Sequence, residues 1–189
     1  MNMWELPISL EIGGVGYSIR TDYRVILDIL HYFTDPNYDE LERQLILIRI
    51  IYTDWEKIPG ELYGEAVQKA VEFIDMGLTA DNSPSVMDWE QDAQIIIPAV
   101  NKVIGKEVRS EPYMHWWTFL SAYMSIGESL FSEVINIRLK KAKGKKLEKY
   151  EKDFYNENKQ LIDMKTKYSD EEIAEQERLK ALLKGDTDG

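Results

Sequence analysis

The segment from residue 41 to residue 52 restricts the possible folds of this chain more than any other part of the sequence. Apolar side chains fall on nearly every side of a helix built from it: Leu41, Leu45, Ile46, Leu47, Ile48, Ile50, Ile51 and Tyr52. A helix that is apolar nearly all round has to be covered by other elements. The segment therefore predicts a central helix in a helical core.

Other stretches also repeat apolar residues at helical spacing and carry signals for helix ends. One begins after the capping pair Thr21-Asp22 and ends before Asp35-Pro36, because a proline disfavours helical geometry in the residue before it. A second covers residues 66–74. A third runs from about residue 89 to residue 104, and the proline inside it is predicted to shorten or kink it.

An aromatic segment, Tyr113–Leu120, carries two of the five tryptophans. The preceding Ser110-Glu111-Pro112 is a helix-start signal, so we predict that the aromatic segment forms the first half of a helix. Gly127 is expected to bend this helix, which then continues to the lysines before Gly144.

Alternating apolar residues on either side of Gly13-Gly14 predict a β-hairpin over about residues 8–20. From residue 145 the apolar residues become sparse and charges dense, and Ser169 opens a last helix with a capping box. The predicted fold is mainly α: a helical core domain over residues 1–144 with an N-terminal β-hairpin, and a charged C-terminal helical arm over residues 145–189. The helices of the arm either pack weakly on the body or project from it.

Charge is distributed unevenly along the 189 residues, whose formal net charge is −11. Residues 1–105 carry 18 acidic and 7 basic side chains, whereas residues 138–149 carry seven basic side chains and one acidic one. An acidic body of this kind repels nucleic acid but still offers one basic patch.

No convergent catalytic or metal-binding pattern occurs in the sequence, so we expect neither enzymatic activity nor a cofactor. There are no cysteines, and the two histidines are far apart. His31 and Asp35 stand one helical turn apart but do not make a metal site by themselves. His115 lies among aromatic residues, which favours a neutral core or interface histidine over a general base. The N-terminus lacks signal-peptide features and no apolar run approaches a membrane span, so we expect a cytoplasmic protein with no membrane contact.

Two groups of residues are candidates for binding a partner. The first is the aromatic set Tyr113, Trp116 and Trp117. Its members are predicted to be mostly core, but neighbouring tryptophans point about 100° apart on a helix, so one of them is a plausible contact. The second is the basic segment with the aromatic residues beyond it: Arg138, Lys140, Lys141, Lys143, Lys145, Lys146, Tyr150 and Phe154. This second group is also compatible with nucleic-acid binding, through phosphate contacts and stacking.

The aromatic segment, the basic segment Lys140-Lys141-x-Lys143-Gly144-Lys145-Lys146 and the N-terminal Tyr17-x-Ile19-x-Thr21-Asp22-Tyr23-Arg24 resemble the "gp fifteen" family of phages and prophages of Gram-positive bacteria. The resemblance spans nearly the whole chain and is densest over residues 113–151. It implies a non-enzymatic tail assembly chaperone in the bacterial host cytoplasm. Such a protein binds the tape measure protein and helps recruit tail-tube subunits. The resemblance implies no catalytic or ligand-binding residues. A homo-oligomer is compatible with this role. A nucleic-acid-associated phage protein and a minor virion structural protein are the alternatives.

Overall fold

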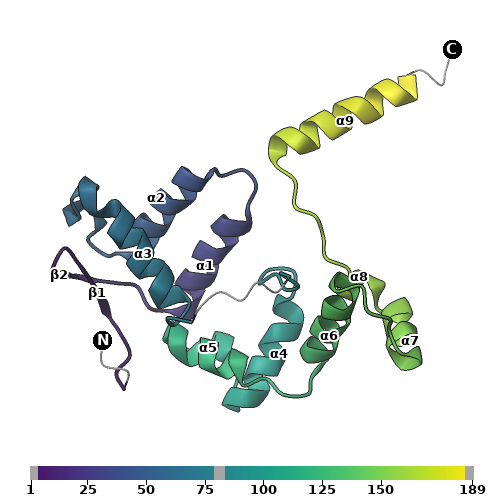
Figure 1. Cartoon of the computed structure of the whole chain (residues 1–189), viewed down its shortest axis with the longest axis horizontal. Helices are drawn as coiled ribbons and strands as arrows, with labels where there is room; N and C mark the ends of the chain where they lie inside the picture. Colours follow the sequence, from purple (N-terminus) through teal and green to yellow (C-terminus); the bar gives the residue numbers. More distant parts are fainter. Residues whose placement is uncertain (1–3, 79–83, 186–189) are drawn as a thin grey trace.

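The computed structural model describes residues 4–78 and 84–185 and is mainly helical with a small N-terminal hairpin, which confirms the predicted fold class (Figure 1). Its α-helices are α1 (Tyr23–Thr34), α2 (Glu40–Ile51), α3 (Tyr63–Ile74), α4 (Ala93–Ile104), α5 (Trp116–Met124), α6 (Leu130–Ala142), α7 (Lys149–Glu157), α8 (Lys159–Ile162) and α9 (Asp170–Gly185). Short 3-10 turns are formed by Trp55–Lys57, Gly60–Leu62 and Val108–Ser110.

The hairpin pairs β1 (Ser9–Ile12) with β2 (Val15–Ser18) in antiparallel register. Its turn uses Gly13 and Gly14, whose φ angles of 56° and 79° lie in the left-handed region that favours glycine. Alternate side chains of β1 are buried, and β1 packs against α3. The hairpin therefore closes one side of the helical core.

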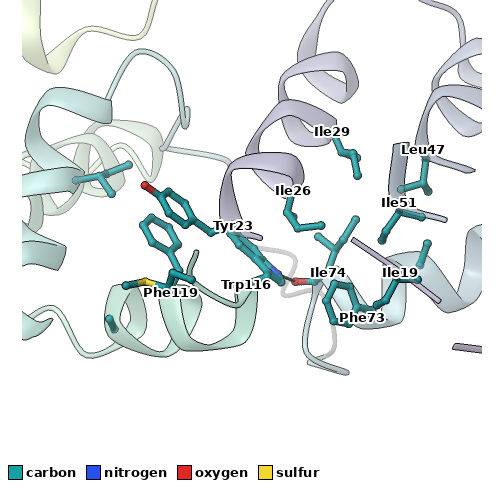
Figure 2. Close-up of a cluster of buried hydrophobic side chains, with 14 of the residues drawn as sticks. Ile19, Tyr23, Ile26, Ile29, Leu47, Ile51, Phe73, Ile74, Trp116 and Phe119 are labelled. Atoms are coloured by element: carbon teal, nitrogen blue, oxygen red, sulfur yellow. Dashed lines mark hydrogen bonds between the residues drawn. The ribbon is translucent and has the colours of Figure 1, made fainter. Parts of the chain in front are cut away.

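The core is built where α2 packs against α1 and α3, and α5 packs against α1 (Figure 2). The last turns of α2 are buried through Leu47, Ile48 and Ile51, and the Tyr52 hydroxyl that follows donates a 2.7 Å hydrogen bond to the Ala66 carbonyl. The prediction of a central helix holds for this half only. Leu41 in the first turn is 64% exposed, because no element of the described residues covers it.

The aromatic segment begins its helix later than predicted. Residues before Trp116 are extended: Tyr23 donates its N–H to the Met114 carbonyl at 3.0 Å, and Trp116 donates its N–H to the Thr21 carbonyl at 2.6 Å. This pairing with the start of α1 uses the backbone groups that a helix from Pro112 would need for itself. The helix signal at 110–112 was therefore misread, and Tyr113 lies outside α5.

Two further boundaries differ from the predictions. α4 begins at Ala93 rather than near residue 89, and it continues through Pro98 to Ile104. α5 and α6 are separate helices rather than one bent helix, because Ser129 and Ser132 form a capping box that starts α6 anew.

The segment beyond residue 145 contains two different kinds of structure. α8 packs against α6 and α7 packs against α8, with Glu151 of α7 and Ile162 of α8 fully buried. By contrast, α9 extends away from the other helices (Figure 1), and its side chains from residue 171 to residue 180 are all exposed. We expected the helices of the arm either to pack weakly on the body or to project from it. Only α9 projects.

Candidate functional site

Both tryptophans of the aromatic segment donate hydrogen bonds to backbone carbonyls within the fold. The Trp116 indole is buried and its Nε1 donates to the Ile74 carbonyl at 2.7 Å. The half-buried Trp117 donates its Nε1 to the Phe73 carbonyl at 2.8 Å. The two indoles therefore satisfy carbonyl groups at the C-terminal end of α3. Tyr113 remains 54% exposed, although its hydroxyl is hydrogen-bonded to Thr21 at 2.7 Å.

His115 is a buried helix cap. Its Nδ1 accepts the backbone N–H of Trp117 at 3.0 Å, and Nε2 lies 3.0 Å from the Pro7 carbonyl. A ring nitrogen that accepts an N–H carries no proton, so Nε2 is the protonated atom and donates to the carbonyl. The ring is neutral, as the sequence suggested, and it joins the N-terminal segment to α5.

Arg138, predicted as part of the basic patch, is buried instead. Its guanidinium forms a two-pronged ion pair with Asp92 at 2.7 and 2.9 Å, and both side chains are nearly fully buried. The remaining N–H groups donate to the carbonyls of Val86, Leu161 and Ile162. Arg138 thus fastens α4 and α8 to α6 and is not available to a surface partner.

Two of the predicted lysines are engaged with acids of the α7 and α8 region. Lys140 pairs with the buried Glu151 carboxylate, and this contact together with the Glu148 backbone N–H lowers the pKa of Glu151. Lys141 pairs with Asp163 at 2.6 Å and lies over the ring of Tyr155. These contacts hold the C-terminal helices in place.

The other predicted lysines, Lys143, Lys145 and Lys146, are exposed, and together with Lys149 at the start of α7 they are called the basic loop here. Among the residues that the structure describes, none of these four ammonium groups has an ion-pair partner within 4.0 Å. Tyr150 next to the loop is 62% exposed, whereas Phe154 is half-buried and packs against the core. The basic loop and Tyr150 are therefore the part of the predicted basic patch that faces solvent.

An apolar groove that the sequence did not predict lies between the end of α5 and the side of α6. It has a volume of about 340 Å³. Its lining residues are Tyr123, Met124, Ile126, Phe131, Ser132, Ile135, Asn136 and Leu139. Met124 is 57% exposed, and most of the other apolar residues are half-buried. The groove is open to solvent and offers mainly aliphatic and aromatic contacts.

The groove leads to the basic loop. Leu139 is its last lining residue on α6, and Lys143, four residues later, caps the C-terminal end of this helix. At the other end, α6 begins next to Glu128 and carries Glu133 in its first turn. The basic loop thus lies at the C-terminal end of the helix that lines the groove.

A second depression, of about 550 Å³, lies between α1 and α2 and is lined by polar groups including Arg20, Asp28 and Arg49. Arg20 donates to the backbone carbonyls of Ile50 and Tyr52, so its charge is used within the fold. His31 at the rim lies 3.3 Å from Glu90. Arg20 and His31 are thus both engaged in contacts within the fold.

Over residues 4–78 and 84–185, no group of three or more histidine, aspartate or glutamate side chains is placed to hold a metal ion. None of the helices in these same ranges is long and apolar enough to cross a membrane.

A family model described as "Bacteriophage Gp15 protein" matches residues 3–169. The match covers the groove and the basic loop and stops immediately before α9. No curated protein and no solved structure matches the chain.

Proposed function

The chain belongs to the bacteriophage Gp15 family, and we propose that it is a non-enzymatic tail assembly chaperone that binds the tape measure protein of the same phage and helps recruit tail-tube subunits. The groove between α5 and α6 is the observation that carries this proposal. An open row of aliphatic and aromatic side chains along a helix suits the apolar face of a partner helix, which is a common mode of peptide recognition.

A tape measure protein is a very long helix with apolar stretches that must remain soluble until the tail tube encloses it. A groove of about 340 Å³ accommodates a few side chains, so each copy would cover one short stretch of that helix. The net charge of −11 would give the covered helix a charged exterior. Several copies along the tape measure would keep its apolar stretches apart.

Co-expression with the tape measure protein tests the proposal. We expect the tape measure to become soluble and to co-purify with the chain, and a chain carrying the groove substitution Met124→Glu to lose most of this effect. Leu41→Glu is the matched control, because Leu41 is exposed on α2 and is not among the residues that line the groove. A tape measure that aggregates to the same extent with and without the chain contradicts the proposal.

The exposed basic loop supports one second candidate, a nucleic-acid-associated phage protein. Its four lysines would contact phosphates, and Tyr150 would stack on a base. The burial of Arg138 and the pairing of Lys140 and Lys141 leave a smaller patch than the sequence suggested. A mobility-shift assay over a range of salt concentrations separates the candidates, since phosphate contacts weaken steeply as salt rises. The presence of the chain in purified particles would instead indicate a minor structural protein of the virion.

A further inference from the structure

α9 packs against no other element over residues 171–180, where its side chains are described. It has sixteen residues, and every side chain from residue 171 to residue 180 is exposed, including Ile173 and Leu179 at 45% and 50%. Isolated helices of about this length are only marginally stable in water, and tertiary packing normally supplies the rest. The stabilising contacts for α9 are therefore expected from another chain.

The strap from residue 163 to residue 169 fixes where α9 begins. Lys167 forms a 3.0 Å ion pair with Asp88, and the Asp170 N–H donates to the Asn37 side chain at 2.8 Å. The start of α9 is thus held at the α1–α2 connection, and the helix then extends away from α5 and α6 (Figure 1). In this position α9 does not reach the groove of its own chain.

The acidic half of α9 is complementary in charge to the basic loop. Its first half is acidic: Asp170, Glu171, Glu172, Glu175 and Glu177. Arg178 and Lys180 follow. The groove has the basic loop at the C-terminal end of α6 and Glu128 and Glu133 at the other end. An antiparallel arrangement of α9 and α6 places the acidic half of α9 on the basic loop and also opposes the two helix dipoles.

The lengths agree with this arrangement. At about 1.5 Å per residue, the sixteen residues of α9 span about 24 Å and the thirteen of α6 about 20 Å. Glu175 and Leu179 are separated by one helical turn, as are Lys143 and Leu139. When Glu175 lies beside Lys143, Leu179 therefore lies beside Leu139 at the end of the groove.

We infer that α9 of one copy binds antiparallel to α6 of a second copy, with Leu179 in the apolar groove and the acidic half of α9 on the basic loop. The contact is between two different surfaces, so it produces either a reciprocal exchange between two copies or a chain of copies. The tape measure helix would displace α9 from the groove; that consequence rests on the proposed function, whereas the self-association does not.

Charge reversal in the full-length chain tests the inference. The variants are Lys145→Glu/Lys146→Glu, Glu171→Lys/Glu175→Lys, and the combination of all four, and the readout is mass by light scattering over a concentration series. All four positions are exposed, so the variants are expected to fold, and circular dichroism checks this. We expect the unchanged chain to self-associate, each double reversal to weaken association at least about tenfold, and the combination to restore it.

Two further variants locate the apolar contact. Leu179→Glu on α9 and Met124→Glu in the groove are each expected to weaken self-association about tenfold or more, because each replaces an apolar contact by a charge. A chain that is monomeric at every concentration overturns the inference, as does a combined charge variant that fails to restore association. Self-association that follows these rules in a chain that does not bind the tape measure keeps the inference and rejects the proposed function.

Discussion

Replacing Arg138 by methionine is expected to destabilise the protein strongly, although the sequence places this residue in an apparent surface patch. Methionine keeps an unbranched apolar side chain but carries no donors, so the substitution leaves the Asp92 carboxylate buried without its cation. It also removes the donors to the carbonyls of Leu161 and Ile162 at the end of α8. The packing of α7 and α8 on α6 depends on these contacts.

The magnitude follows from the geometry of the pair. All five guanidinium N–H groups of Arg138 have acceptors, and the side chains of Arg138 and Asp92 are 3% and 0% exposed. Removing one partner of such a pair costs about 3–5 kcal/mol in the free energy of unfolding. For a chain of this size that corresponds to a melting temperature lower by about 6–20 °C.

Urea and thermal unfolding followed by tryptophan fluorescence and circular dichroism measure this effect. Lys145→Met is the matched control, an exposed lysine of the same basic stretch, and should change stability by no more than about 0.5 kcal/mol. The double variant Asp92→Leu/Arg138→Met should be more stable than Arg138→Met, because no unpaired charge remains buried. An Arg138→Met protein with the unfolding midpoint of the unchanged chain would refute the buried ion pair.

Three further predictions concern the hairpin turn, acid stability and α7. Gly13→Ala should lower the free energy of unfolding by about 1–3 kcal/mol, since Gly13 has a φ of 56° and an added Cβ would lie 2.7 Å from the Leu62 side chain; Gly16→Ala, with no atom within 4 Å, is the control. Hydrogen bonds from Arg109 lower the pKa of Glu107 to about 2. Glu107 therefore contributes stability above its unfolded pKa of about 4.5, and this contribution is lost as the pH falls towards 2. Glu107→Gln should accordingly reduce the urea midpoint near neutral pH and have little effect in strong acid. Glu151→Ala should increase proteolytic cleavage within α7, because the buried Glu151 carboxylate holds that helix on α6 through Lys140.

Each of these three predictions would be contradicted by a specific result. Equal midpoints for the two glycine variants would contradict the strained turn. A Glu107→Gln effect of the same size at every pH would show that the carboxylate charge is not what matters. Unchanged proteolysis of the Glu151→Ala protein would mean that α7 is held by its apolar contacts alone.

The helices whose ends are set by local chemistry could be predicted from the sequence. Asp22 caps α1 and Asp39 caps α2 with a reciprocal bond to Glu42, and both signals lie within a few residues of the helix they start. The Gly13-Gly14 turn is equally local. These elements needed no knowledge of distant partners.

The aromatic segment was misread because a distant segment decides its conformation. Its residues before Trp116 pair with the start of α1, about 90 positions earlier in the chain, and His115 rather than Ser110 caps the helix. No local pattern reports such a partner.

The burial of Arg138 was also not predicted, because its ion-pair partner is distant in the sequence. In the sequence it stands among lysines, and its partner Asp92 is 46 residues away. The groove was not predicted, because it arises from the break between α5 and α6 at residues 125–129. The glycine at 127 was interpreted as a bend, and the Ser129 cap that starts a new helix was overlooked.

The affinity of purified chain for a soluble tape measure fragment, compared between Met124→Glu and Leu41→Glu, tests the central claim most directly. Both variants place a new carboxylate at an exposed apolar position, but only Met124 lines the groove between α5 and α6. We predict that Met124→Glu raises the dissociation constant about tenfold or more while Leu41→Glu leaves it nearly unchanged. Equal affinities for the two variants would contradict the claim that the groove is the binding site.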